Sequence, residues 1–304
     1  MTKLAPLFVI LGASLWGVDG ILLRPGLYSL PVPLVVWVET TLVALILTVA
    51  LHKYLPEIRQ LERKDWLAFA GVALFGGVIG TMSITKALFY VNFVNLSIVI
   101  LIQKLQPVFA ISLAALFLKE RPPRIFFLWA ALAIFGAYLM TFGAGGPNLG
   151  TGDKTAVAAL FALLAATGFA ASTVLSKRAL KNTSFHLATY LRFLFTASLM
   201  LIIASLTRDI TQIGQISSKQ VFLFLLIAFT TGGPAIFLYY YGLKKISASV
   251  ATICELAFPL TAVILEYVTR ENILHYVQWI GVAILFTSIL RVSRLKPAAV
   301  RPGT

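Results

Sequence analysis

Long apolar runs alternate with short polar segments along the whole chain. Each run is about 20 residues long, which is enough to cross a roughly 30 Å hydrocarbon core as an α-helix. The residue-by-residue alternation of a transmembrane β-barrel is absent. The sequence therefore predicts an all-α membrane protein with ten transmembrane helices. The predicted spans are 4–23, 32–52, 66–90, 96–118, 124–143, 155–176, 185–207, 219–243, 248–268 and 274–294.

The composition agrees with an integral membrane protein. Of the 304 residues, 59% are hydrophobic and 12% are charged, whereas a soluble domain carries roughly 25% charged residues. The first apolar run has no small-residue cleavage site near its end, so we expect it to remain as a helix. The formal net charge of +14 would suggest nucleic-acid binding in a soluble protein. In a membrane protein it indicates basic loops, and we expect no nucleic-acid partner.

Lysine and arginine are distributed unevenly between the two sides of the predicted bundle. Loops on the side that holds both termini carry 17 of these residues, and loops on the other side carry 5. Because basic residues concentrate on the cytoplasmic side of membrane proteins, we predict a multi-pass protein of the inner (plasma) membrane with both termini in the cytoplasm. The five residues on the other side are Arg24, Lys154, Arg208, Lys219 and Arg270.

The two halves of the chain repeat one another. The halves are 1–150 and 151–304, with five predicted helices each, and an odd number of helices turns the second copy upside down. Such inverted repeats are typical of transporters with a site near the midplane. The recurring pairs are Gly80 and Gly232, Pro107 and Pro259, each separated by 152 residues, and Glu120 and Glu271, separated by 151.

Polar residues interrupt the apolar spans near mid-membrane. Gln103 and Lys104 lie inside the fourth span, where a charge costs at least about 2.5–3.5 kcal/mol on insertion scales. Glu39 and Glu255 lie at similar depth in the second and ninth spans. We expect Lys104 to face a water-filled central cavity, with Glu255 or Glu39 as its counter-charge when the site is empty. A purely structural ion pair is the alternative.

Prolines follow two of these polar residues. Pro107 and Pro259 cannot bond the carbonyl four residues earlier, so they are expected to release the carbonyls of Gln103 and Glu255 into a central space. Irregular backbone at this depth is tolerated where it lines a cavity or is buried in protein. We predict hinges at these two prolines and at Gly80 and Gly232; packing kinks are the alternative reading. Aromatic side chains predicted to line the substrate route are Trp16, Tyr90 and Tyr240, although an interfacial belt also explains the tyrosines.

Several segments carry a resemblance to a known family. They are "LWG" at 15–17, "NLSIVILIQKLQPVFAISLAALFLKE" at 95–120 and "ASVATICELAFPLTAVILEYVTRE" at 248–271. The chain resembles the ten-helix EamA-type branch of the drug/metabolite transporter superfamily, and among its members is most similar to the aromatic amino-acid exporters. The resemblance implies export of small metabolites. Lys104 departs from the usual pattern, which has no charge there.

We therefore predict a secondary transporter that exports small amphipathic metabolites, with neutral or aromatic amino acids as the favoured substrates. Lys104 would bind the substrate carboxylate, and Glu255 would accept hydrogen bonds from its ammonium group. A multidrug or cation exporter, a channel and an intramembrane enzyme are the alternatives. The sequence contains no HExxH, GxSxG or P-loop motif, so we expect no catalytic residue, cofactor or metal. A monomer in the lipid bilayer is expected.

Overall fold

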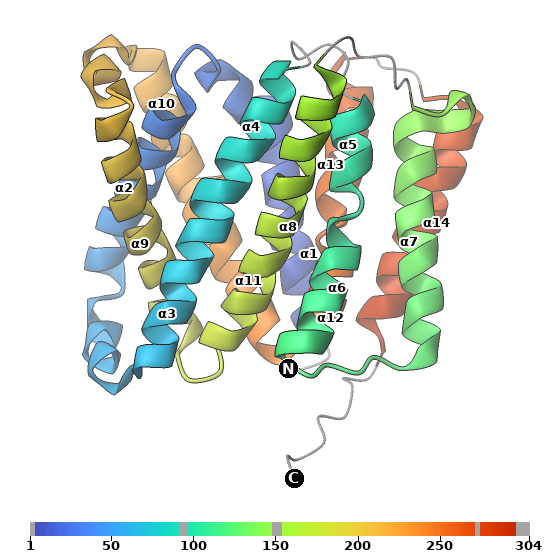
Figure 1. Ribbon diagram of the computed structural model, residues 1–304, viewed down its shortest axis with the longest axis horizontal. Helices are drawn as coiled ribbons and strands as arrows, with labels where there is room; N and C mark the ends of the chain where they lie inside the picture. Colours follow the sequence, from blue (N-terminus) through green and yellow to red (C-terminus); the bar gives the residue numbers. More distant parts are fainter. Residues whose placement is uncertain (1–3, 91–96, 148–153, 271–273, 296–304) are drawn as a thin grey trace.

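The computed structural model describes residues 4–90, 97–147, 154–270 and 274–295. In these ranges all regular elements are helical (Figure 1), either α-helices (α) or short 3₁₀ and π segments (η). They are α1 (Ala5–Val18), η2 (Asp19–Leu23), η3 (Arg24–Leu27), α2 (Val32–Ala50), η4 (His52–Gln60), α3 (Arg63–Val72), η5 (Ala73–Gly80), α4 (Thr81–Tyr90), α5 (Ser97–Gln103), α6 (Gln106–Phe117), α7 (Arg124–Phe142), η6 (Gly143–Gly145), α8 (Thr155–Ala179), α9 (Phe185–Leu206), η7 (Asp209–Gln215), α10 (Ser218–Ile227), η8 (Ala228–Gly232), α11 (Gly233–Lys245), α12 (Ala248–Cys254), α13 (Ala257–Arg270) and α14 (Tyr276–Ser293).

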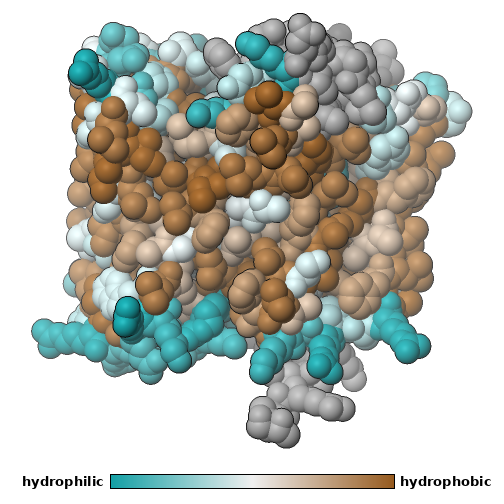
Figure 2. Space-filling model, in the orientation of Figure 1, coloured by the Kyte–Doolittle hydropathy of each residue, from teal (hydrophilic) through white to brown (hydrophobic). Residues whose placement is uncertain are grey.

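These elements combine into ten helices that are long and apolar enough to cross a membrane, which confirms the predicted number for the described residues. Many large apolar side chains on them point outward, Leu116 and Leu206 being 71% and 79% exposed, as lipid-facing positions require. Figure 2 shows this apolar surface as a band between two hydrophilic edges. Numbered spans 1 to 10, the helices are Ala5–Leu27, Val32–Ala50, Arg63–Ala87, Val99–Phe117, Arg124–Gly145, Ala156–Ala179, Phe185–Leu206, Ser218–Lys245, Ala248–Thr269 and Tyr276–Ser293.

Span 1 is longer than predicted, because it continues to Leu27 instead of ending at residue 23. The charge of Arg24 and the following Pro25–Gly26 pair indicated a loop after residue 23. In the structure Arg24 lies in the last turn of the span and forms ion pairs with two carboxylates. Its charge is therefore neutralised within the bundle, and Arg24 does not belong to the loop residues.

The two halves of the chain exchange helices. Span 1 packs against spans 8 and 9 of the second half, and span 6 packs against spans 3 and 4 of the first half. Spans 2 and 7 form another pair across the halves, and so do spans 5 and 10. In Figure 1, α8 accordingly lies between α4 and the α5–α6 pair. This exchange is the arrangement expected of two inverted repeats.

The same irregularities occur at equivalent places in the two halves. Span 4 breaks between α5 and α6, and span 9 breaks between α12 and α13, each just before the predicted proline. The π segments η5 and η8 end at Gly80 and Gly232. π segments frequently occur at functional sites. Hinge motion at these four positions stays a prediction, and so does the boundary near residue 150, which lies outside the described residues.

One expectation about the broken helices is wrong. Pro259 was expected to leave the Glu255 carbonyl free, but that carbonyl accepts a hydrogen bond from the Phe258 backbone N–H at 2.9 Å. The chain tightens into a 3₁₀-like turn at the break, and this turn supplies a different donor. Release of the Gln103 carbonyl stays a prediction.

Glu120 connects the two halves at the terminal face, which is the end of the bundle where α1 begins and α14 ends (bottom of Figure 1). Its carboxylate accepts hydrogen bonds from the backbone N–H groups of Ala248 and Ser249 at 2.7 and 2.9 Å, and from the Ser249 hydroxyl at 2.6 Å. These N–H groups begin α12 and have no partner within the helix. The predicted counterpart, Glu271, lies outside the described residues.

Replacing Glu120 with Gln is expected to destabilise the protein. The substitution removes the charge and turns one acceptor oxygen into a donor that faces other donors, so the free energy of unfolding should fall by about 1.5–3 kcal/mol. The midpoint of thermal unfolding in detergent measures this loss. Arg121→Gln changes the exposed neighbour and should leave the midpoint unchanged. Equal midpoints for the two variants would contradict the role of Glu120.

Candidate functional site

Three side chains from three other spans meet around the carboxylate of Glu255 in the terminal half of the bundle. Glu255 Oε1 accepts hydrogen bonds from the hydroxyls of Tyr239, at 2.6 Å, and Thr173, at 3.3 Å. Glu255 Oε2 accepts one from the Gln106 side-chain amide at 3.3 Å. We call these four residues the terminal-side cluster. Glu255 is seven residues into span 9, about 10 Å from its end at 1.5 Å per residue.

The helix breaks position this cluster. Glu255 occupies the turn between α12 and α13, and Gln106 is the first residue of α6 after the corresponding turn in span 4. Because span 4 and span 9 touch through α6 and α12, the two breaks bring the amide and the carboxylate together. The interrupted backbone therefore places polar side chains at the same depth of the bundle.

An aromatic pair borders the cluster. The rings of Trp16 and Tyr239 are 5.3 Å apart at an angle of 52°. Tyr239 is buried, whereas Trp16 is half-buried and covers it from α1. Aromatic rings at this spacing attract one another, and a flat aromatic molecule can stack on such a ring in the same way. Tyr239 thus links the predicted site residue Trp16, through its ring, to the predicted site residue Glu255, through its hydroxyl.

Tyr240 lies next to this pair but points into the core. It is fully buried, and its hydroxyl is 2.9 Å from the Ser176 hydroxyl and accepts a hydrogen bond from Arg192 Nη1 at 3.3 Å. Among the three consecutive tyrosines, Tyr239 and not Tyr240 reaches Glu255. A substrate contact by Tyr240 stays a prediction that its burial does not favour.

A second polar group lies nearer the far face, the end of the bundle opposite the terminal face. Arg24 Nε donates to Asp19 at 2.6 Å, and Arg24 Nη2 is 3.1 Å from Glu39 Oε2. The Thr231 hydroxyl donates to the second oxygen of Asp19 at 3.4 Å. We call these four residues the far-side ion cluster. It joins spans 1, 2 and 8 with two carboxylates and one guanidinium.

These contacts correct the predicted pairing of Lys104. Glu39 is paired with Arg24, and Glu255 is held by neutral donors, so neither carboxylate is the counter-charge of Lys104. Lys104 itself lies half-buried in the turn between α5 and α6. Among the described residues none forms an ion pair with it. Sequence alone could not show that Arg24 competes for Glu39.

The remaining predicted side chains are spread over the bundle. The Gln103 amide donates to the Ala162 carbonyl of α8 at 2.8 Å, which fixes span 4 to span 6. Tyr90 lies at the far end of α4, where its ring stacks on Phe161 at 5.6 Å and Lys154 Nζ is 5.8 Å away. The structure therefore connects Trp16 and Glu255 through Tyr239, and leaves Tyr90 at the bundle end.

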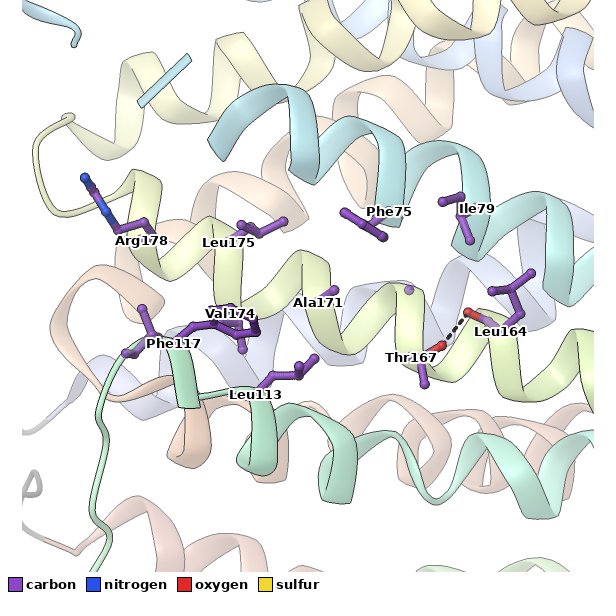
Figure 3. A pocket seen from close by; sticks show the side chains of 12 residues that line it. Phe75, Ile79, Leu113, Phe117, Leu164, Thr167, Ala171, Val174, Leu175 and Arg178 are labelled. Atoms are coloured by element: carbon purple, nitrogen blue, oxygen red, sulfur yellow. Dashed lines mark hydrogen bonds between the residues drawn. The ribbon is translucent and has the colours of Figure 1, made fainter. Parts of the chain in front are cut away.

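An apolar groove of about 600 Å³ lies on the surface between η5 and α6, with α8 as its floor (Figure 3). Phe75 and Ile79 point into it from one side and Leu113 and Phe117 from the other. None of the predicted substrate-binding residues is part of its lining. The groove is a separate feature from the two polar clusters, and its apolar walls suit contact with lipid chains.

Sequence reasoning missed several residues of the two clusters. Thr173 and Thr231 are neutral and gave no signal in an apolar span. Gln106 lies close to Gln103 and Lys104 in the fourth span but was assigned no role, and Arg24 was read as a loop residue. One signal was available for Asp19: an acidic residue five positions before an arginine, both close to a predicted helix end.

The two halves of the chain match one family model. The EamA-like transporter family model matches residues 3–142 and 156–294. The chain belongs to this family. The predicted branch of the drug/metabolite transporter superfamily is thereby confirmed, and this EamA-like protein is a multi-pass membrane transporter. That result fits the expectation that it is not an enzyme.

Curated relatives of this EamA-like transporter span most of its length. It is 43% identical over 290 residues to the riboflavin transporter ImpX of Fusobacterium nucleatum, covering 95% of this chain and 97% of that protein. An uncharacterized transporter of Synechocystis is 26% identical over 262 residues, covering 82% of this chain and 70% of that protein. The predicted similarity to aromatic amino-acid exporters is not supported by these relatives.

A solved crystal structure shares the fold. It superimposes with a TM-score of 0.75, covering 94% of this chain and 94% of the other at 17% identity. At this identity the likeness concerns the fold alone. It agrees with ten helices in two inverted halves.

Proposed function

We propose that this EamA-like transporter carries riboflavin across the membrane. The observation that carries the proposal is the 43% identity to a riboflavin transporter over nearly the full length of both chains. Riboflavin takes precedence over the amino-acid substrates favoured by the sequence, and it is likewise a small amphipathic molecule for a secondary transporter.

The chemistry of the terminal-side cluster suits such a molecule. Riboflavin combines a flat three-ring system with polar ring edges and a chain of hydroxyl groups. Trp16, half-buried beside Tyr239, offers an aromatic face for the rings. Glu255 and Gln106 offer an acceptor and a donor for hydroxyl or ring N–H and C=O groups. A few convergent polar groups among apolar walls are the usual composition of a small-molecule site.

The structure also suggests how access alternates. Within the described residues, spans 4 and 9 pack mainly through α6 and α12, their terminal halves. Lys177 Nζ donates to the Leu243 carbonyl at 2.8 Å, and Glu120 binds the start of α12. These contacts close the terminal side. We infer that this conformation is open to the far face. Bending of spans 4 and 9 at the Pro107 and Pro259 breaks would open the site to the terminal face instead. From the basic loops we propose that the terminal face lies in the cytoplasm.

Growth of a riboflavin-requiring bacterium without its own riboflavin transporter tests the proposed substrate. Expression of this chain should restore growth at low external riboflavin, and radiolabelled riboflavin should equilibrate faster across the membrane. A panel of amines, dyes and amino acids, offered as competitors, tests the multidrug alternative. Rates that do not change with expression, at verified membrane abundance, would overturn the riboflavin proposal.

Amino-acid export remains a second candidate because Lys104 has no ion-pair partner among the described residues. A deep ammonium group without a counter-charge is available for a substrate carboxylate. Lys104→Gln should then raise the Michaelis constant for amino acids by roughly tenfold, which corresponds to a loss of about 1.4 kcal/mol of binding free energy. The Michaelis constant for riboflavin should change much less.

The same variant measures whether Lys104 stabilises the fold. Because it breaks no ion pair among the described residues, Lys104→Gln should leave the thermal midpoint in detergent unchanged. A fall of the size expected for breaking a buried pair, roughly 3–5 kcal/mol, would reveal a structural partner and contradict this assignment. Equal Michaelis constants in wild type and variant for every carboxylate-bearing substrate would remove the amino-acid candidate.

A further inference from the structure

We propose that Glu255 is a proton-binding site whose protonation opens the terminal side of the transporter. The inference that the proton drives riboflavin transport rests on the proposed function, whereas the opening of the terminal side on protonation does not.

The hydrogen-bond partners of the Glu255 carboxylate carry no charge. Glu255 receives hydrogen bonds from Tyr239, Thr173 and Gln106, all of them neutral donors. In the part of the chain that the structure describes, no lysine, arginine or histidine nitrogen lies within 4 Å of it. A carboxylate in a membrane interior without a cation is costly to keep ionised and takes up a proton readily. Its charge therefore depends on the donors around it.

The elements packed around Glu255 carry few other titratable groups. Tyr239 comes from α11, and α1 and α6 contribute no titratable side chain in their described lengths. Lys177 of α8 is engaged with backbone carbonyls at the end of α11, and Arg291 of α14 lies over the Trp129 ring. Arg192 of α9 donates to Tyr240 one residue away, so it favours the ionised carboxylate from a distance. The neighbouring Cys254 is fully buried.

The geometry links the charge to the gate. The ionised carboxylate accepts from α6, α8 and α11 at once, and these helices belong to spans 4, 6 and 8. Glu255 itself follows α12 in span 9. The same four spans must separate for the terminal side to open. Protonation gives the carboxyl group one O–H donor and reduces its acceptor capacity, so it weakens the contacts that hold the four spans together.

The position equivalent to Glu255 in the first half of the chain cannot bind a proton. Glu255 and Gln103 are separated by 152 residues, the spacing of the repeat, and Gln103 carries an amide that does not titrate. Its side chain donates to the Ala162 carbonyl. The terminal gate is therefore sensitive to protons, whereas the corresponding contact of the first half is not. A proton taken up from the far side leaves when the terminal side opens.

Distance measurements on the purified protein without substrate test the opening. Spin labels on Lys119→Cys and Lys244→Cys, exposed at the terminal ends of spans 4 and 8, report the gate in a Cys254→Ala background. Lowering the pH should populate a longer distance. With Glu255→Gln the longer distance should be present at every pH, because the amide imitates the protonated group. With Glu57→Gln, a carboxylate outside the cluster, the pH response should remain. A distance in the Glu255 wild-type background that does not change with pH overturns the proposal.

Proteoliposomes test the coupling. A difference of one pH unit, acidic outside, should support up to about tenfold accumulation of riboflavin if one proton accompanies each molecule. Glu255→Gln should lose this accumulation and keep exchange of labelled for unlabelled riboflavin. Accumulation retained in Glu255→Gln overturns the assignment to this residue. If riboflavin is not carried by the wild type at all, the proposed function fails, and the spin-label measurement still decides the proton site.

Discussion

Arg24→Leu is expected to cause the largest loss of stability of any substitution in the far-side ion cluster. The change leaves Asp19 and Glu39 facing each other without a cation, at side-chain exposures of 8% and 12%. Removing one partner of a buried ion pair typically costs about 3–5 kcal/mol. The thermal unfolding midpoint in detergent should fall accordingly, and part of the protein should be lost from the membrane.

Two comparisons make this result specific. Lys219→Leu removes an exposed basic residue at the same face and should leave the midpoint near that of the wild type. Adding Asp19→Asn and Glu39→Gln to Arg24→Leu should restore most of the lost stability, because no uncompensated charge remains. If Arg24→Leu alone matches Lys219→Leu, the ion cluster does not hold spans 1, 2 and 8 together.

Trp16→Ala is expected to cause the largest loss of transport among the aromatic substitutions. Trp16 provides the accessible face of the aromatic pair with Tyr239. Stacking of a flat ring on an aromatic side chain is worth about 1–3 kcal/mol in nucleic-acid complexes, and a similar loss here would raise the Michaelis constant for riboflavin by roughly five- to 150-fold. Uptake at several riboflavin concentrations measures it.

The matched control retains an aromatic ring. Trp16→Phe should recover most of the affinity, since the face for stacking is smaller but present. Quenching of riboflavin fluorescence by the purified protein offers an independent readout, and it should weaken in Trp16→Ala more than in Trp16→Phe. Equal Michaelis constants for wild type and Trp16→Ala would place the flavin ring elsewhere in the bundle.

The spans and their breaks were predictable because they depend on local sequence. An apolar run of about 20 residues crosses a bilayer whatever it packs against, and Pro107 or Pro259 interrupts a helix by its own geometry. The repeat was also predictable from local sequence, because Gly80 and Gly232 are separated by the repeat spacing. In the structure both residues end equivalent π segments. These features need no knowledge of neighbours.

Partners in the polar clusters were not predictable, because they are chosen by tertiary packing. Gln106 and Glu255 are 149 residues apart in the chain, and Thr173 reaches the same carboxylate from 82 residues away. Which of three consecutive tyrosines faces Glu255 depends on helix phase, and successive residues differ by about 100°. A charge such as Glu39 deep in a span indicates that a counter-charge is needed. The sequence does not show whether Arg24 or Lys104 supplies it.

Riboflavin uptake by proteoliposomes that contain only this protein tests whether riboflavin is its substrate. We predict uptake that saturates with riboflavin concentration, is inhibited by unlabelled riboflavin, is resistant to excess aromatic amino acids and is weakened by Trp16→Ala. Uptake no faster than into empty liposomes, from a preparation whose thermal midpoint shows that it is folded, would contradict this prediction.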